Sequence, residues 1–291
     1  MQTVNFFKVK EELSGIDVQE NVNVGELTRY KTGGSARLLI TPKTTDELAR
    51  AVKTVKGLCP YAVIGNGSNL LVSDKGYNGA VITTKLLTKM EFKGNLLIAE
   101  CGAKLPGVVK ECALNSLSGL EFAVSIPATV GGAISMNAGC YGKSVGDCVC
   151  YVVTEMGTVK KADCEFGYRK SRFSEGETVI KACFLLKPEE YEVIEEQISA
   201  YKGSRKNPKG RNCGSVFKND GYYAGKVIDE CGLKGLRVGG AVVSSEHANF
   251  IIAEDGATSS DIYELILKIK NKVNKKRQIT LFEELVYLGD F

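Results

Sequence analysis

Four short glycine-bearing segments constrain what this chain can fold into more than any other feature. They read G-N-G-S-N at 65–69, S-I-P-A-T-V-G-G-A at 125–133, G-Y-R-K-S-R-F at 167–173 and G-S-V-F-K-N at 214–219. Glycine accepts positive φ and lets backbone N–H groups come close to an anion. We therefore expect the first two segments to wrap around phosphate, and the last two to present an arginine and a serine from tight turns. This pattern favours an enzyme with a nucleotide cofactor over a scaffold protein.

Length and charge fit a protein of two or three domains that binds a small anion. The chain has 291 residues, which exceeds a typical single domain. Its excess of glycine, 32 residues in all, falls in the four segments rather than in a repeat. The formal net charge of +4 suits an anionic ligand but is too small to indicate a nucleic-acid binder, so no nucleic-acid partner is expected.

The cysteines and the single histidine argue against a metal centre. There are ten cysteines but no C-x-x-C pair, and Cys148 and Cys150 alone do not make a zinc site. Because His247 is the sole histidine, a zinc or iron centre and a histidine-based catalytic triad are not expected. The sequence shows no signal-peptide core and no stretch long enough to span a membrane. We expect a cytoplasmic protein without membrane attachment, because its many thiols suit a reducing compartment.

Hydrophobic patterns predict helices and strands in three consecutive parts, residues 1–84, 85–188 and 189–291. In the first part, Thr44 and Glu47 form a capping box that opens a helix. Four strands of this part are expected to form one small sheet, at 36–41, 61–64, 70–72 and 80–83.

The second and third parts are predicted in the same way. The second part is expected to contain strands, a helix and a hairpin, at 95–100, 106–114, 150–155 with 158–162, and 178–186. Residues 125–142, rich in glycine and alanine, are interpreted as loop and turns. The third part is expected to contain two helices and three strands, at 189–203 and 261–277, and at 241–243, 250–253 and 281–288. The predicted fold class is α+β.

Generic nucleotide-binding motifs are incomplete in this chain. The pair Gly65 and Gly67 begins a G-x-G-x-x-G fingerprint, but Leu70 stands where the third glycine is needed. Lys143 and Ser144 resemble the end of a phosphate-binding P-loop, but its first glycine is absent. Two phosphate-friendly loops nevertheless remain, in the first and second glycine segments. Because they fall in adjacent parts of the chain, they favour a dinucleotide held between those parts.

The order of the glycine segments resembles one known family. The string I-P-A-T-V-G-G-A-I-S-M-N-A-G-C-Y-G at 126–142 is similar to the flavin-pyrophosphate segment of the UDP-N-acetylenolpyruvoylglucosamine reductase (MurB) family. The resemblance extends to G-N-G-S-N-L-L-V-S-D at 65–74 and S-S-E-H-A-N-F-I-I-A at 244–253, and to the third and fourth segments. It covers about residues 27–289 in the family's order. The length resembles the shorter subtype, which lacks an inserted tyrosine-bearing loop.

The resemblance implies an FAD-binding domain in two parts, of the vanillyl-alcohol-oxidase type, and a substrate domain. The two FAD-binding parts would be 1–84 and 85–188, and the substrate domain would be 189–291. It implies that FAD is held noncovalently and reduced by NADPH. UDP-N-acetylglucosamine enolpyruvate would then become UDP-N-acetylmuramate, a step of bacterial peptidoglycan synthesis that supports cell-wall biogenesis, cell shape and cell division. The resemblance leaves the oligomeric state open.

The resemblance also assigns the cofactor-binding residues. These are Gly65, Asn66, Gly67, Ser68 and Asn69 in the first segment, and Ser125, Ile126, Ala128, Thr129, Gly131, Gly132 and Ala133 in the second. The chain departs from the family's pattern at four places, which are Ala128 for glycine, 211–213 for a Pro-Ser-Ala type sequence, Asp220 for proline, and the ending at 281–289.

The chemistry of the implied reaction needs a charge, a proton donor and a hydride. The positions that match the family's catalytic residues are Arg169, Ser215 and Glu284. An arginine offers a fixed positive charge to a developing enolate, and a hydroxyl on a tight turn can deliver a proton. Glu283 lies next to Glu284, and counting back from the closing glycine selects Glu284.

Substrate contacts are expected from Tyr168, Lys218 and Asn219. His247 is expected to be structural, since it lies far along the sequence from the first two glycine segments. Two other functions stay open at this point. One is an FAD-dependent oxidase on the same scaffold, and the other is a flavin-binding protein without catalysis.

Overall fold

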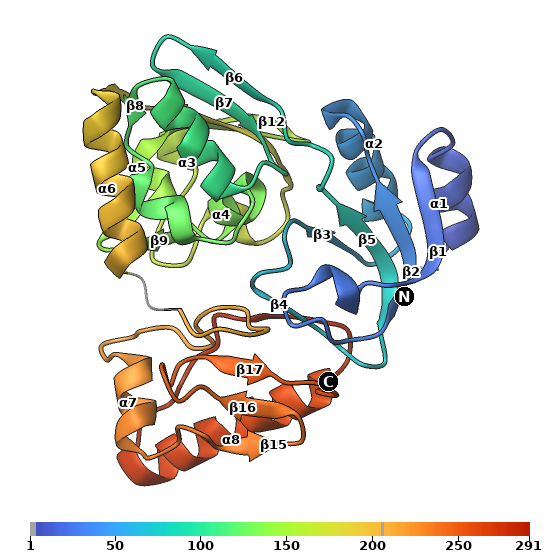
Figure 1. Ribbon diagram of the computed structural model, residues 1–291. Coiled ribbons are helices and arrows are strands. Elements are labelled where there is room, and N and C mark those ends of the chain that lie inside the picture. The colour runs from blue at the N-terminus through green and yellow to red at the C-terminus, as the bar shows by residue number, and fades with distance from the viewer. Residues whose placement is uncertain (1–3, 205–206) are drawn as a thin grey trace. The chain divides into compact units, whose positions relative to one another are not determined.

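The computed structural model describes residues 4–204 and 207–291, which divide into two units (Figure 1). Unit 1 takes the described residues of Met1–Gln19, Leu38–Asn66 and Ala80–Lys206. Unit 2 takes Glu20–Arg37, Gly67–Gly79 and Asn207–Phe291. Residues 20–37 and 67–79 thus belong with the C-terminal part of the chain. The predicted boundaries after residues 84 and 188 stay predictions.

Unit 1 contains a five-stranded antiparallel sheet in the order β12-β11-β13-β7-β6, and this sheet with its helices is the larger part of the unit. Its strands are β6 (Met90–Lys93), β7 (Leu96–Glu100), β11 (Val149–Thr154), β12 (Gly157–Lys160) and β13 (Val179–Leu185). The helices of this part are α3 (Leu105–Leu114), α4 (Val130–Ser135), α5 (Val145–Cys148) and α6 (Tyr191–Ser204). The predicted strands, helix and hairpin of the second part are confirmed to within one or two residues.

A second sheet has the order β1-β2-β5-β3, and its strands β3 and β5 run parallel. The strands are β1 (Asp17–Asn23), β2 (Ser35–Thr41), β3 (Tyr61–Ile64) and β5 (Tyr77–Thr83), and the helices nearby in sequence are α1 (Phe6–Glu12) and α2 (Thr45–Lys56). The N-cap of α2 is Thr44, whose hydroxyl accepts the Glu47 N–H at 3.2 Å as expected. One face of α2 is fully buried because its apolar residues recur at helical spacing.

The prediction that residues 70–72 join this sheet is wrong. Strand β4 (Leu70–Val72) pairs in parallel with β18 (Val286–Leu288) in unit 2. The predicted strand 281–288 is shorter in the structure, where only Val286–Leu288 is a strand and Glu283 forms an isolated bridge with Phe217. A three-residue apolar run shows that a strand is buried, but it does not identify a partner more than two hundred residues away.

Unit 2 is built from a three-stranded antiparallel sheet and the long helix α8 (Ser259–Arg277). The strands are β15 (Arg237–Val238), β16 (Ala241–Val243) and β17 (Ile251–Ala253), and α7 (Ala224–Glu230) precedes them. In Figure 1 the helix α8 runs along this sheet, and its contacts with β15 and β16 agree. Thr258 and Asp261 cap α8 reciprocally, and the predicted apolar stripe of the helix is buried.

Short elements complete the two units. They are the paired strands β8 (Leu117–Ser118) with β14 (Lys187–Pro188), and β9 (Gly139–Cys140) with β10 (Lys143–Ser144), and the 3-10 helices η1 (Gly25–Leu27), η2 (Glu121–Ser125), η3 (Lys161–Asp163) and η4 (Arg172–Ser174). Among the described helices, none has the length and apolar composition needed to cross a bilayer.

Candidate active site

The first and second glycine segments meet within unit 1, at Gly65 and Thr129. A Cβ built on Gly65 would lie 2.2 Å from the Thr129 Oγ1, so only glycine allows this approach. The neighbouring Asn66 Nδ2 donates a hydrogen bond to the Pro127 carbonyl at 2.7 Å. These contacts bring together two segments that the sequence predicted to share one dinucleotide.

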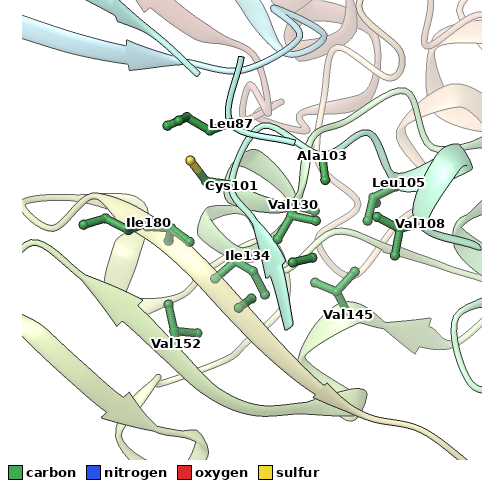
Figure 2. Packing of buried hydrophobic residues seen from close by; sticks show 14 of the residues in the cluster. Leu87, Cys101, Ala103, Leu105, Val108, Val130, Ile134, Val145, Val152 and Ile180 are labelled. Carbon is green, nitrogen blue, oxygen red and sulfur yellow. The ribbon is translucent and has the colours of Figure 1, made fainter. Parts of the chain in front are cut away.

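The second segment contains a helix that the sequence analysis interpreted as loop. Helix α4 begins after Thr129, whose hydroxyl accepts the Gly132 N–H at 3.5 Å. Val130 and Ile134 are buried, and Figure 2 shows them in one cluster with Val145 and with the sheet residues Val152 and Ile180. Two glycines in six residues lower the helix propensity, so the helix depends on this packing.

The two glycines of α4 differ in what surrounds them. The Gly131 N–H donates to the Cys101 carbonyl at 2.8 Å, and a Cβ there would lie 3.0 Å from the Cys101 Cβ. Gly132 is exposed, and a Cβ there would meet only the Thr129 hydroxyl, at 3.7 Å. Packing against Cys101 explains the glycine at 131. Only Gly132 leaves open surface, which fits the close approach of a pyrophosphate.

The other predicted FAD ligands of the second segment lie around α4. Ser125 and Ala128 are partly exposed, whereas Ile126 and Ala133 are buried. The Ala128 carbonyl accepts the Leu105 N–H at 3.0 Å. A contact of these residues with FAD stays a prediction.

The rest of the first segment belongs to unit 2. The Gly67 carbonyl accepts the Arg29 N–H at 3.0 Å, and Ser68 is partly exposed. Asn69 accepts the Val286 N–H on its own carbonyl at 3.0 Å, and its Nδ2 donates to the Glu284 carbonyl at 2.9 Å. Asn69 therefore extends the β4–β18 pairing toward Glu284.

Arg169 lies at the tip of a two-residue turn between Gly167 and Lys170. These two residues exchange backbone hydrogen bonds, from the Gly167 N–H at 2.9 Å and from the Lys170 N–H at 3.3 Å. Arg169 has φ +54°, a left-handed conformation that favours glycine. Its guanidinium carbon lies 5.2 Å from the ring centroid of Tyr168, which is itself 58% exposed. Strained backbone of this kind concentrates at functional sites.

Three polar side chains that the sequence analysis did not single out hold this turn. The Asn137 Nδ2 donates to the Gly167 carbonyl at 2.9 Å. The hydroxyls of Ser171 and Ser174 both donate to the Ser135 carbonyl at the end of α4, each at 2.8 Å. The Arg169 turn is therefore fixed to the end of the second segment. The one signal in the sequence for this contact is that Asn137 lies within residues 126–142, the segment that resembles the MurB family.

Ser215 follows Gly214, which has φ +78°. The Gly214 N–H donates to the Asn212 Oδ1 at 3.1 Å, and the Val216 N–H donates to the Asn249 carbonyl at 2.9 Å. Ser215 itself is partly exposed. As predicted, the fourth segment presents a serine from a tight turn.

Glu284 lies next to the Ser215 turn through the backbone, because its N–H donates to the Val216 carbonyl at 2.8 Å. The carboxylate of Glu283 is engaged elsewhere, since the Lys270 Nζ lies 2.7 and 2.9 Å from its two oxygens. This ion pair gives Glu283 a structural function and supports the choice of Glu284 for the site.

The predicted substrate contacts Lys218 and Asn219 follow on the same segment. The Lys218 N–H donates to the Phe282 carbonyl at 2.8 Å, and its side chain is partly exposed. The exposed Asn219 accepts the Ala224 N–H at the start of α7, at 3.0 Å. Their contact with a substrate stays a prediction.

The histidine and two buried thiols, Cys101 and Cys213, show no features of a reactive group. All ten cysteines are free, and burial raises the pKa of Cys101 and of Cys213 to about 12. Burial lowers the pKa of His247, whose ring packs edge-on against Phe250 at 4.8 Å. No metal-binding group of three or more His, Cys, Asp or Glu residues occurs within residues 4–204 and 207–291.

Comparison with known proteins assigns the family. The FAD binding domain model matches residues 36–163, and the UDP-N-acetylenolpyruvoylglucosamine reductase C-terminal domain model matches residues 206–288. A UDP-N-acetylenolpyruvoylglucosamine reductase of Caldicellulosiruptor bescii is 40% identical over 98% of this chain and 95% of its own length. One of Streptococcus thermophilus is 40% identical over 97% of each chain. The chain belongs to the MurB family.

A solved structure supports the same assignment. The crystal structure of MurB from Thermus caldophilus superposes with a TM-score of 0.83 at 36% identity, covering 94% of this chain and all of that one. The predicted α+β class, with an FAD-binding domain and a C-terminal MurB domain, is confirmed.

Residues 211–213 depart from the MurB pattern, yet they serve the turn. Asn212 supplies the oxygen that accepts the Gly214 N–H, as a serine at this position also could. Its Nδ2 donates to the carbonyls of Pro208 and Gly210 at 3.2 and 3.0 Å. Cys213 is buried and points its thiol at the Gly67 carbonyl, 3.6 Å away. Residues 211–213 therefore supply local hydrogen bonds before Ser215.

Proposed function

We propose that this chain is a UDP-N-acetylmuramate dehydrogenase that uses FAD and NADPH. The observation that carries the proposal is the Ser215 turn. Hydrogen bonds fix Gly214 before it and Val216 after it, and Val216 also holds Glu284. The MurB family supplies the substrate class, UDP-N-acetylglucosamine enolpyruvate, and the product, UDP-N-acetylmuramate.

The residues around Gly65 and Gly132 are those that would hold FAD. The approach of Gly65 to Thr129 brings the two loops together, and the open surface at Gly132 leaves room for a pyrophosphate. When bound and reduced by NADPH, FAD supplies two electrons as a hydride to the carbon–carbon double bond. Neither glycine segment contains a histidine, which supports noncovalent binding.

Side chains of the protein stabilise the developing negative charge and deliver the proton. The Ser215 hydroxyl gives a proton to the carbon beside the substrate carboxylate, which balances the hydride added to the neighbouring carbon. Arg169 and Glu284 support the developing enolate, and the fixed positive charge of Arg169 stabilises the negative charge on the carboxylate side. Tyr168, Lys218 and Asn219 contact the substrate.

The biological setting follows from this reaction. Its product is a peptidoglycan precursor, so the protein would act in cell-wall biogenesis, and thereby in cell shape and cell division. Ten free thiols support a reducing compartment, and we assign the protein to the cytoplasm.

Ser215→Ala tests the proposal by separating the two half-reactions. Reduction of the flavin by NADPH needs no proton from Ser215 and should proceed at the wild-type rate. Reoxidation by the enolpyruvyl sugar should slow by about 10²–10⁴-fold, the range for a lost general acid. Anaerobic stopped-flow absorbance of the flavin measures both steps.

Two outcomes would contradict the proposal. Equal slowing of both steps would make Ser215 a structural turn residue. If wild-type protein reduced by NADPH were reoxidised by oxygen but not by the UDP-sugar, an oxidase function on the same scaffold would replace the one proposed here.

A further inference from the structure

Asn249 hydrogen-bonds to the backbone of Val216 and Phe217 much as a neighbouring β-strand would, but most of these bonds come from its side chain. It is 4% exposed, and its carboxamide faces Phe217, 32 positions earlier. The Asn249 Oδ1 accepts the Phe217 N–H at 2.9 Å, and its Nδ2 donates to the Phe217 carbonyl at 2.9 Å. Its own backbone carbonyl accepts the Val216 N–H, also at 2.9 Å.

These bonds satisfy backbone groups that water cannot reach. Val216 and Phe217 are each 1% exposed, and a buried N–H or carbonyl without a partner is strongly destabilising. The two bonds to Phe217 also fix the amide orientation, since one requires an oxygen and the other an N–H. No apolar or acidic side chain of this size offers both.

The other side of Ser215 is held in a related way. Asn212 is 7% exposed, and its Oδ1 accepts the Gly214 N–H at 3.1 Å. Backbone on either side of Ser215 is thus bonded to a buried asparagine, Asn212 before it and Asn249 after it. The Ser215 side chain has few rotamers, so the direction of its hydroxyl depends on this backbone.

We propose that Asn212 and Asn249 are positioning residues for proton delivery by Ser215. The proposal rests on the function proposed above, in which Ser215 is the proton donor. Neither asparagine touches the reacting atoms. They act by holding the Ser215 backbone where its hydroxyl can reach the substrate carbon, since misplacement of a reacting group by about 1 Å can cost ~10²-fold in rate.

The experiment combines single and double variants of the FAD-loaded enzyme. Asn249→Ala should slow reoxidation by the enolpyruvyl sugar by about 10- to 100-fold while flavin reduction by NADPH stays unchanged. In a Ser215→Ala background, the same substitution should change reoxidation by less than about twofold, because residues that act as one unit are not additive. Asn212→Ala should behave likewise, and Asn212→Ser, which keeps an acceptor oxygen, should restore most of the rate.

Hydrogen–deuterium exchange gives a readout that does not depend on activity. Peptides that contain Val216 and Phe217 should exchange faster in Asn249→Ala, and peptides from α8 should not. Ser259→Ala is the matched control. It removes a buried hydrogen bond to the Thr32 hydroxyl, 2.7 Å long, elsewhere in unit 2. It should lower stability without changing the ratio of the two half-reactions.

The outcomes separate this proposal from the function on which it depends. Additive losses in the Ser215→Ala background, or faster exchange without slower reoxidation, would overturn the positioning role and leave Ser215 as proton donor. A Ser215→Ala enzyme with wild-type reoxidation would overturn the proton donor itself, and the positioning proposal with it. If Asn249→Ala does not fold, the Asn212 pair of variants decides the matter by the same criteria.

Discussion

Replacing Gly132 by alanine should raise the stability of the apoprotein and weaken FAD binding at the same time. Gly132 is the third residue of α4, it is exposed, and its new Cβ would meet only the Thr129 hydroxyl at 3.7 Å. Exchanging glycine for alanine in a helix is worth roughly 0.5–1 kcal/mol. We therefore expect the unfolding temperature of the apoprotein to rise by about 1–4 °C.

Binding of FAD should respond in the opposite direction. If the pyrophosphate lies against Gly132, the added methyl group overpacks that contact, which costs about 1–3 kcal/mol. That cost corresponds to a roughly 5- to 150-fold increase in the dissociation constant for FAD. Titration of the apoprotein with FAD, followed by flavin fluorescence, gives this constant, and calorimetry gives the unfolding temperature.

Gly107→Ala is the matched control for this experiment. Gly107 is the third residue of α3, it is also exposed, and no atom lies within 4 Å of the Cβ it would gain. It should gain similar stability without any change in FAD affinity. Wild-type FAD affinity in Gly132→Ala would refute the placement of the pyrophosphate. A loss of apoprotein stability would refute the reasoning from the open surface.

Two further predictions concern the cofactor link and the choice of glutamate. Acid precipitation of the holoprotein should release all FAD into the supernatant, and flavin that stays with the pellet would contradict noncovalent binding. Glu284→Gln should slow reoxidation of the flavin with little change in unfolding temperature, as stopped-flow absorbance and calorimetry would show. Glu283→Gln should instead lose about 1 kcal/mol or less of stability, since its partly exposed pair with Lys270 is weakened, and keep the wild-type rate; the reverse pattern would exchange the two assignments.

The elements with strong local signals could be predicted from the sequence. Helix α2 has its cap and its apolar stripe within twelve residues, and the stripe of α8 recurs at helical spacing from Ile262 to Val273. Strands β3 and β16 stand where the sequence placed them because turn residues bound short β-branched runs. In these elements, propensity, pattern and capping all agree.

What could not be predicted depends on distant partners. Strand β4 pairs with β18, and α4 is helical because its apolar residues find a sheet to cover, not because its sequence favours a helix. The division of the chain into units has the same origin, since residues 67–79 join a C-terminal part that the sequence alone cannot show to be their partner.

The candidate site shows the same limit at the level of single side chains. Motifs indicated the groups proposed to carry the chemistry, namely Arg169, Ser215 and Glu284. They did not identify the amides that hold the backbone around them, because an asparagine in a loop has the same local signal whether it meets solvent, ligand or a distant strand. In the structure, several asparagines donate from Nδ2 to carbonyls of other segments, namely Asn66, Asn69, Asn137 and Asn249.

This use of asparagine changes how the first glycine segment should contribute to the site. Asn66 is among the residues predicted to bind FAD, yet its side-chain Nδ2 donates to the Pro127 carbonyl at 2.7 Å. That bond, with the contact between Gly65 and Thr129, sets the distance between two backbone loops. In a fixed loop, each backbone N–H keeps its position as a hydrogen-bond donor, whereas a side-chain donor can rotate away from the anion. A site that fixes its loops with side chains and meets the anion with backbone is therefore already organised before the cofactor arrives.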